Sequence, residues 1–241
     1  MSESEAFDYF FGEGYVTEIV RPLSSGKEAS VFLCRATATA GGGLLAMKVY
    51  RPRDHRSFKN DQAYKAGRVI LNGHDRRAVA KKSRYGREFE EGWWTSREWE
   101  VLGALHRVGA DVPRPVAAAD GAIQMGYVGG EEASAPQLRH VSLGPGEARE
   151  VFDRLMWNVE LALRHNLIHA DLSSFNILWW EGRATIIDLP QAVDPRSNPN
   201  ASDLLARDVE NVCRHFERYG LRRDPHAITR GLWTGFLFAD L

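Results

Sequence analysis

The order of strand-like and helix-like segments is the feature that most constrains the fold of this 241-residue chain. Apolar runs at residues 15–23, 29–38 and 44–50 are separated by glycine-containing turns. This pattern predicts an antiparallel meander. A further short apolar strand is expected at residues 122–128, after two prolines and before a pair of glycines.

The later part of the chain has a mostly helical pattern. Apolar residues recur at helical spacing over 94–105, over 147–165, and from about residue 200 to a stop before Gly220. Two short apolar segments, 176–180 and 184–188, flank Glu-Gly-Arg and predict a hairpin. Strands followed by helices predict a two-lobed α+β architecture, in which a nucleotide is expected to lie between the lobes.

The bulk properties are those of a globular cytoplasmic protein. Hydrophobic residues make up 44% of the chain, enough for a real core. No run approaches the roughly 18 apolar residues that a membrane span needs, and the acidic first residues do not form a signal peptide. Cys34 and Cys213 lie far apart without metal-ligand spacing, so we expect reduced thiols and a cytoplasmic location.

Charge is distributed unevenly along the chain. Residues 51–87 contain twelve Lys or Arg and three Asp, although the whole chain has a formal net charge of −1. Such asymmetry suggests an anionic partner or ligand. A solvated surface insertion is an equally good explanation, so both interpretations stay open.

The strongest chemical signal is the segment HADLSSFN at residues 169–176, followed by Asp188 at the end of an apolar strand. Phosphoryl transfer needs metal ions on the phosphates and a group that orients the nucleophile. Asp171 is expected to orient the acceptor hydroxyl, while Asn176 and Asp188 supply oxygen ligands of the kind Mg²⁺ prefers. Local loop hydrogen bonds are the alternative for Asp171 and Asn176.

A lysine within an apolar strand is the second signal. Lys48 lies in the run AMKVY, and lysine is rarely buried without a partner. A lysine that contacts ATP phosphates while paired with a helix glutamate fits this pattern, and Glu98 is the best candidate for that glutamate. An edge lysine that extends to water is the alternative.

A third and weaker signal is SSGKEASV at residues 24–31, between the first two expected strands. Its backbone N–H groups could cover phosphates. With one glycine, however, it is neither a GxGxxG loop nor a Walker loop, and alone it is better explained as a hairpin turn.

Taken together, these segments resemble the RIO family of atypical serine kinases. The resemblance covers roughly residues 15–219 in one order. It rests on SGKEA at 25–29, AMK at 46–48, Trp94 with residues 98–102, VPRP at 112–115, MGYVG at 125–129, the 169–176 segment, Ile187-Asp188, and RDVEN at 207–211.

The resemblance implies a protein-kinase-like fold, ATP and Mg²⁺ as cofactors, and the winged-helix-lacking first subfamily. It implies an N-lobe at about 12–125 with an antiparallel sheet, one helix and a flexible basic insertion at about 51–92. A hinge at about 126–130 and a small, mostly helical C-lobe with the catalytic hairpin at about 131–241 would follow.

The resemblance also assigns roles to residues. It places Ser25, Lys27 and Val31 at the ATP phosphates, makes Met125 the gatekeeper, and brings the backbone of Gly126 and Val128 to adenine. It implies either serine phosphorylation or an ATPase cycle through a phosphoaspartate at Asp188. For the basic segment 51–87 it suggests a ribosome precursor or RNA as partner, with self-phosphorylation candidates at Ser57 and Ser83.

Three departures from ordinary protein kinases are visible. Ala170 replaces the arginine of the HRD motif, and Pro190, whose φ is locked, stands where DFG has its glycine. Few residues follow Asp188, so a peptide-docking lobe of ordinary size is not expected. The remaining alternatives are a small-molecule kinase of the aminoglycoside-phosphotransferase type and a non-catalytic ATP-binding scaffold.

Overall fold

The computed structural model describes residues 1–51 and 84–241, with the backbone alone for residues 84–94 and Pro145. Within these residues the chain forms two compact units. Unit 1 comprises residues 1–51, 84–103 and 113–127, and unit 2 comprises residues 104–112 and 128–241. Most of the basic segment, with Ser57 and Ser83, lies outside the described residues, so its expected role stays a prediction.

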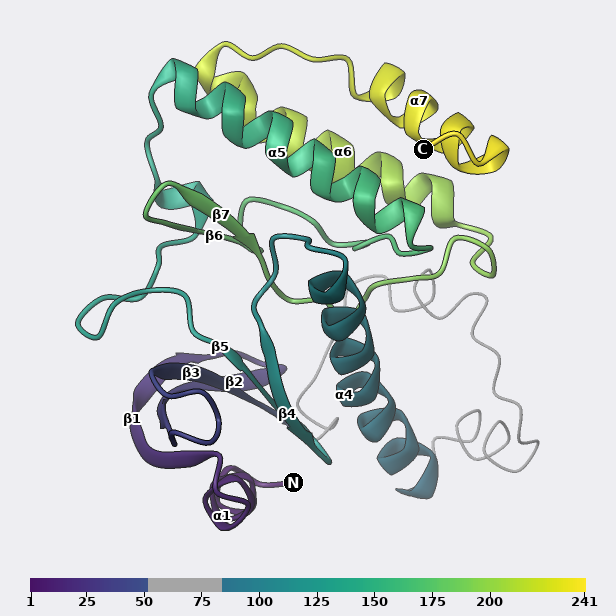
Figure 1. Ribbon diagram of the computed structural model, residues 1–241. Coiled ribbons are helices and arrows are strands. Elements are labelled where there is room, and N and C mark those ends of the chain that lie inside the picture. The colour runs from purple at the N-terminus through teal and green to yellow at the C-terminus, as the bar shows by residue number, and fades with distance from the viewer. Residues whose placement is uncertain (52–83) are drawn as a thin grey trace. The chain divides into compact units, whose positions relative to one another are not determined.

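Unit 1 contains a five-stranded antiparallel sheet with the order β1-β2-β3-β5-β4 (Figure 1). The predicted meander is present. One strand was not predicted, because the prolines before it were interpreted as a break. It begins with Pro115 on an edge of the sheet, where a missing N–H costs little. The strands are β1 (Val16–Ser25), β2 (Ala29–Ala36), β3 (Leu44–Tyr50), β4 (Pro115–Ala119) and β5 (Ala122–Gly126).

The register of the sheet assigns its side chains to two faces. Lys48 of β3 lies opposite Val31 of β2 and Ile123 of β5, and Ala46 lies opposite Met125. Because directly paired residues share a face, Val31, Lys48 and Met125 point to the same side. The opposite face, which includes Met47, belongs to a buried apolar cluster.

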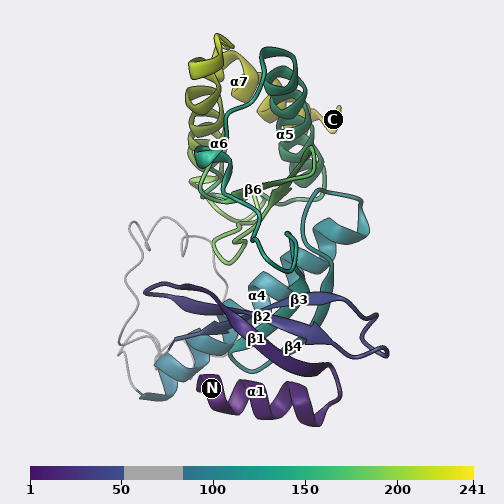
Figure 2. The ribbon, with the colours of Figure 1, turned by 90° about the vertical axis from the view of Figure 1, so that its left-hand side faces the viewer.

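A helix that the sequence analysis did not predict, α1 (Glu3–Gly12), covers that apolar face (Figure 2). Ala6 and Phe10 of α1 are fully buried in the cluster. Its start is a capping box: the Ser2 hydroxyl accepts from the Glu5 N–H at 3.2 Å, and Glu5 Oε2 accepts from the Ser2 N–H at 2.6 Å. The local signal was therefore present in the sequence as Ser-x-x-Glu.

The helix α4 (Arg84–Arg107) begins well before the apolar stripe from which it was predicted. Its residues up to Gly103 belong to unit 1 and its last turn belongs to unit 2. The stripe itself is buried as expected at Val101, Leu102 and Leu105.

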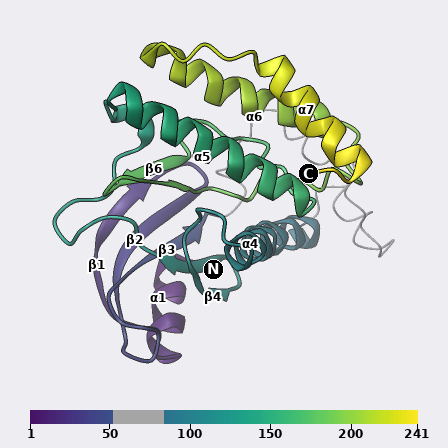
Figure 3. The ribbon, with the colours of Figure 1, turned by 45° about the horizontal axis from the view of Figure 1, so that its top comes forward.

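Unit 2 consists of three long helices and a hairpin, and the helices lie side by side (Figures 1 and 3). Two of the helices and the hairpin agree with the predicted segments within a few residues. The third helix was not predicted, although Asp224 caps it and a proline opens it, a typical start signal. The elements are η2 (Leu138–His140), α5 (Pro145–Arg164), β6 (Ile177–Trp180), β7 (Arg183–Ile186), α6 (Ala201–Phe216), η3 (Glu217–Tyr219) and α7 (Pro225–Phe238).

Two expectations from composition can be compared with the described residues. Cys34 and Cys213 are both free and buried. Among the described helices, none combines the length and apolar character required to cross a membrane.

Candidate active site

Lys48 and Glu98 form a buried ion pair within unit 1. Lys48 Nζ donates to both carboxylate oxygens of Glu98, at 3.0 and 2.9 Å. The two side chains are 12% and 3% exposed. Strand β3 directs Lys48 to the face shared with Val31 and Met125, and α4 supplies Glu98 to the same face. The pair thus holds an ammonium group on one side of the sheet.

The turn between β1 and β2 carries the residues predicted to contact phosphate. The Gly26 N–H donates to the Ala29 carbonyl at 2.9 Å, which closes a tight hairpin turn. Lys27 is exposed at its tip. The Ser25 hydroxyl accepts a hydrogen bond from Arg51 Nη2 at 2.5 Å, so this side chain already has a partner within unit 1.

The predicted adenine-binding residues follow one another at the end of β5. The Gly126 N–H donates to the Arg114 carbonyl at 2.8 Å, and the Val128 carbonyl accepts from the Ala135 N–H at 3.2 Å. A contact between adenine and Val128 would therefore use the Val128 N–H. Met125 is half-buried on the Lys48 face.

Asp171, Asn176 and Asp188 are brought to the same end of the hairpin in unit 2. The Asn176 amide nitrogen donates to the Asp171 carbonyl at 2.9 Å and lies 3.4 Å from Asp171 Oδ2. The Ile187 N–H donates to the Asn176 carbonyl at 2.9 Å, which places Asp188 one residue beyond the open end of the hairpin. Asp188 has φ of 66°, a left-handed conformation that is costly for a residue with a side chain.

Burial and neighbouring charges shift the protonation of this loop. Burial raises the pKa of Asp171, with a further increase from Asp188 and opposing effects from His169 and Arg207. A carboxylate with a raised pKa is a stronger base when ionised. Burial lowers the pKa of His169. The neutral ring fits its contacts, because Nδ1 accepts from the Asp171 N–H at 3.3 Å and Nε2–H can donate to the Ile187 carbonyl at 3.1 Å.

Asp208 of α6 holds the backbone of the loop at residues 169–176. Its two oxygens accept hydrogen bonds from the N–H groups of Ala170 and Leu172, at 2.7 and 2.8 Å. Arg207 donates to the Ala170 carbonyl, and Asn211 donates to the Leu172 carbonyl at 3.1 Å. Ala170 has φ of 68°, so these bonds stabilise another left-handed residue.

Asp208 belongs to the RDVEN segment of the family resemblance, which assigns no role to it. Its side chain is 2% exposed, and burial raises its pKa to about 7, opposed by the two N–H donors. A carboxylate within an apolar helical stripe indicates that it needs a partner, but does not reveal that the partner is a loop 36 residues earlier in the chain.

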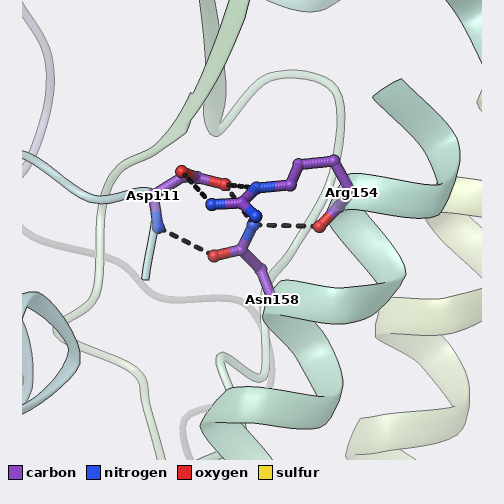
Figure 4. A network of polar contacts seen from close by, with 3 residues as sticks. All are labelled: Asp111, Arg154 and Asn158. Carbon is purple, nitrogen blue, oxygen red and sulfur yellow. Dashed lines mark hydrogen bonds and ion pairs between the residues drawn. The ribbon is translucent and has the colours of Figure 1, made fainter. Parts of the chain in front are cut away.

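A second polar network, also not predicted, fixes the segment that follows α4 (Figure 4). Asp111 accepts from Arg154 Nε at 2.5 Å and from Arg154 Nη2 at 2.9 Å. Asn158 Nδ2 donates to Asp111 Oδ2 at 2.6 Å, and Asn158 Oδ1 accepts from the Asp111 N–H at 2.8 Å. The Asp111 carbonyl in turn accepts from the Ile186 N–H of β7 at 2.7 Å. This network, the Asp111 clamp, therefore holds the strand that leads to Asp188.

The oxygen atoms at the hairpin end suit Mg²⁺. The amide nitrogen of Asn176 is used by Asp171, so its amide oxygen is the atom that can face a cation, together with the Asp188 carboxylate. Within the described residues, no group of three or more His, Cys, Asp or Glu side chains forms a metal site. Two protein oxygens fit Mg²⁺, which keeps water and phosphate ligands in the rest of its shell.

A sheet with a lysine–glutamate pair and a helical unit with an aspartate–asparagine loop define a protein-kinase-like enzyme. Residues 30–228 match the family model described as the RIO domain. Rio2 kinase from Chaetomium thermophilum, in its ADP/Mg²⁺-phosphoaspartate complex, matches 93% of this chain and 64% of its own with a TM-score of 0.69 and 23% identity. That similarity confirms the predicted fold.

The chain belongs to the RIO family of serine/threonine-protein kinases, as its sequence predicted. The RIO-type kinase Rio1 of Haloferax volcanii is 32% identical over 219 residues, which is 90% of this chain and 69% of the relative. Human RIO1 is 29% identical over 214 residues, which is 86% of this chain and 35% of the relative. The chain therefore spans about two thirds of the archaeal relative and about one third of the human one.

Proposed function

We propose that this chain transfers the terminal phosphoryl group of Mg²⁺-bound ATP, either to a serine hydroxyl or to its own Asp188. The expected class, a kinase of RIO type, is confirmed by the kinase names of the relatives. The ADP/Mg²⁺ complex of Rio2 supports the use of ATP and Mg²⁺. The observation that carries the proposal is the pairing of Asn176 with Asp171 at the hairpin end that leads to Asp188.

Each group has a role that its surroundings support. Lys48, held by Glu98, neutralises phosphate oxygens, while Ser25, Lys27 and Val31 lie around the triphosphate. The backbone of Gly126 and Val128 contacts adenine beside Met125. These parts correspond to an N-lobe at 12–125, a hinge at 126–130 and a C-lobe at 131–241.

The chemical step uses the groups of the hairpin end. Asp171 accepts the proton of the attacking hydroxyl, and Asn176 and Asp188 hold Mg²⁺, which neutralises the charge on the phosphates. In the self-modifying reaction, an Asp188 oxygen attacks the terminal phosphorus and ADP leaves. Water then cleaves the acyl phosphate to restore Asp188 and release phosphate.

The basic segment 51–87 and the cellular compartment complete the proposal. The excess of positive charge in residues 51–87 supports an anionic partner such as RNA or a ribosome precursor. The free, buried cysteines support a reducing cytoplasmic location.

Incubation with radiolabelled ATP and Mg²⁺ tests the reaction. Acid-stable phosphoserine is separated from hydroxylamine-labile acyl phosphate by chemistry and mass spectrometry. Asp188→Asn should remove the labile product, whereas Asp153→Asn, an exposed aspartate of α5, is the matched control and should keep it. Labile phosphate that persists in Asp188→Asn would exclude Asp188 as the acceptor.

The same incubation, with sugars and amino alcohols added, distinguishes this proposal from a small-molecule kinase and from a non-catalytic ATP-binding scaffold. Transfer to sugars or amino alcohols without any protein phosphate would favour a small-molecule kinase. ATP binding without any turnover would favour a scaffold.

A further inference from the structure

Phe175 is an exposed aromatic side chain in the loop that carries the proposed catalytic groups. It lies four residues after Asp171 and directly before Asn176, and 51% of its surface is exposed. The Asn176 N–H donates to the Ser173 carbonyl at 2.9 Å, so Phe175 occupies a turn. A large apolar side chain on a functional loop is suited to contact with a partner.

Arg139 stacks on this ring from η2. Its guanidinium carbon lies 4.2 Å from the centroid of Phe175, within the range of a cation–π interaction. The Arg139 N–H donates to the Ser174 carbonyl at 3.2 Å, and the Arg139 carbonyl accepts from Arg218 Nη1 at 3.4 Å. The backbone of Arg139 is thus held on both sides, which keeps its side chain beside the loop.

Arg139 and Arg218 each bring a positive charge to this surface. Within the part of the chain that the structure describes, neither Arg139 nor Arg218 has a carboxylate within ion-pair distance, whereas Arg154, Arg196 and Arg214 each have one. Arg139 stacks on the exposed Phe175 ring, while Arg218 bonds the Arg139 carbonyl and lies over the Tyr219 ring at 5.1 Å. The two guanidinium groups favour a ligand that carries both carboxylates and apolar surface.

We infer that Phe175, Arg139 and Arg218 form an acceptor-docking surface for a protein segment with acidic residues beside its serine. This inference rests on the proposed function and extends it by naming the class of acceptor. The apolar part of the segment covers Phe175, and its carboxylates pair with the two arginines. The position of Phe175, four residues from the base that receives the hydroxyl proton, favours a peptide acceptor over a nucleic acid strand.

Two fluorescent peptides test the inference with the full chain, ATP and Mg²⁺. Both peptides contain a central serine and a leucine. The residues that flank the serine are glutamates in one peptide and lysines in the other. Phosphorylation rates give KM and kcat for each peptide, and fluorescence anisotropy gives its dissociation constant. ATP turnover without peptide is measured in parallel, so loss of the proposed function itself is recognised separately.

The wild-type protein should prefer the glutamate peptide. Phe175→Ala or Arg139→Gln should raise the KM or the dissociation constant for that peptide about 10-fold, with a much smaller fall in kcat. Phe175→Tyr, which keeps the ring, should restore wild-type values. Trp157→Ala is the matched control, because Trp157 of α5 is also an exposed aromatic residue, at 39%, and its ring also carries an arginine, with the guanidinium carbon of Arg154 3.9 Å from the ring centroid.

Three outcomes would overturn the inference. The first is an unchanged KM and binding in Phe175→Ala and Arg139→Gln. The second is a wild-type protein that turns over ATP but neither binds nor phosphorylates the glutamate peptide, or prefers the lysine peptide. The third is a loss of single-stranded oligonucleotide binding in these variants with peptide binding intact, which would assign the surface to nucleic acid.

Discussion

Both carboxylate oxygens of Glu98 accept hydrogen bonds from Lys48 Nζ, although the two residues are 50 positions apart. Lys48→Ala should weaken ATP binding and also destabilise the fold, because it leaves a buried carboxylate without its cation. The loss of unfolding free energy should be roughly 3–5 kcal/mol, measured by urea denaturation. The double variant Lys48→Met, Glu98→Leu should recover much of this stability but no activity. Equal stability of the single variant and the wild type would contradict the prediction.

Replacement of the proposed base should separate catalysis from binding. Asp171→Ala should lower kcat roughly 10²–10⁴-fold, since proton acceptance matters mainly in the transition state. Binding of Mg²⁺-ATP should change little, because Asn176 keeps its 2.9 Å bond to the backbone carbonyl of residue 171. Steady-state kinetics and calorimetric titration measure the two quantities. Wild-type turnover in this variant would remove Asp171 from the role.

The two hydrogen bonds by which Asp208 anchors the 169–176 loop should be sensitive to replacement of the carboxylate by an amide. In Asp208→Asn one oxygen still accepts a backbone N–H, but the new NH₂ group faces the other N–H donor. The unsatisfied pair should cost about 1–3 kcal/mol of unfolding free energy and reduce kcat through loss of loop geometry. Asp203→Asn, an exposed position on the same helix, serves as the control. If the two variants unfold at the same urea concentration, the anchor contributes nothing.

Within the Asp111 clamp, the buried amide should matter more than the arginine. Asn158 is 3% exposed and bonds both the backbone and the side chain of Asp111, whereas the Arg154 side chain is 50% exposed. We expect Asn158→Ala to cost roughly 1–3 kcal/mol and Arg154→Ala about 1 kcal/mol or less. Urea denaturation of the two variants gives the comparison. The reverse order would show that the ion pair, rather than the amide, holds the segment.

The lowered pKa of His215 predicts that the folded protein loses stability in mild acid. Burial, with a further effect from Arg218, lowers its pKa to about 4, while an unfolded histidine titrates near pH 6.5. The folded state therefore favours the neutral ring, and its contribution to stability is full above pH 6.5 and is lost as the pH falls toward 4.

The difference between the folded and unfolded pKa of His215 should reduce the free energy of unfolding by up to about 2 kcal/mol between pH 7.5 and pH 5.0. The His215→Leu variant should lose less over the same interval, which urea denaturation at the two pH values can measure. Identical losses in both proteins would mean that His215 does not titrate on unfolding.

Much of the fold could be predicted because its signals are local. Strand β3, the hairpin β6–β7 and the helices α5 and α6 follow from periodicity and turn residues within short windows. The helices α1 and α7 were missed even though Ser2 and Asp224 provide cap signals, because no clear apolar stripe accompanied them. The candidate residues of the hairpin end were found because their spacing alone is informative.

Only the tertiary structure showed which distant residues support those candidates. Asp208 bonds the loop around Ala170, Asn158 bonds Asp111 across 47 positions, and Arg139 stacks on Phe175. Each pair joins segments that propensity and periodicity treat separately. A carboxylate, an amide or an arginine can serve as a solvated surface group or as a buried partner. The path of the chain decides between these roles, because it determines which groups lose water and therefore need each other.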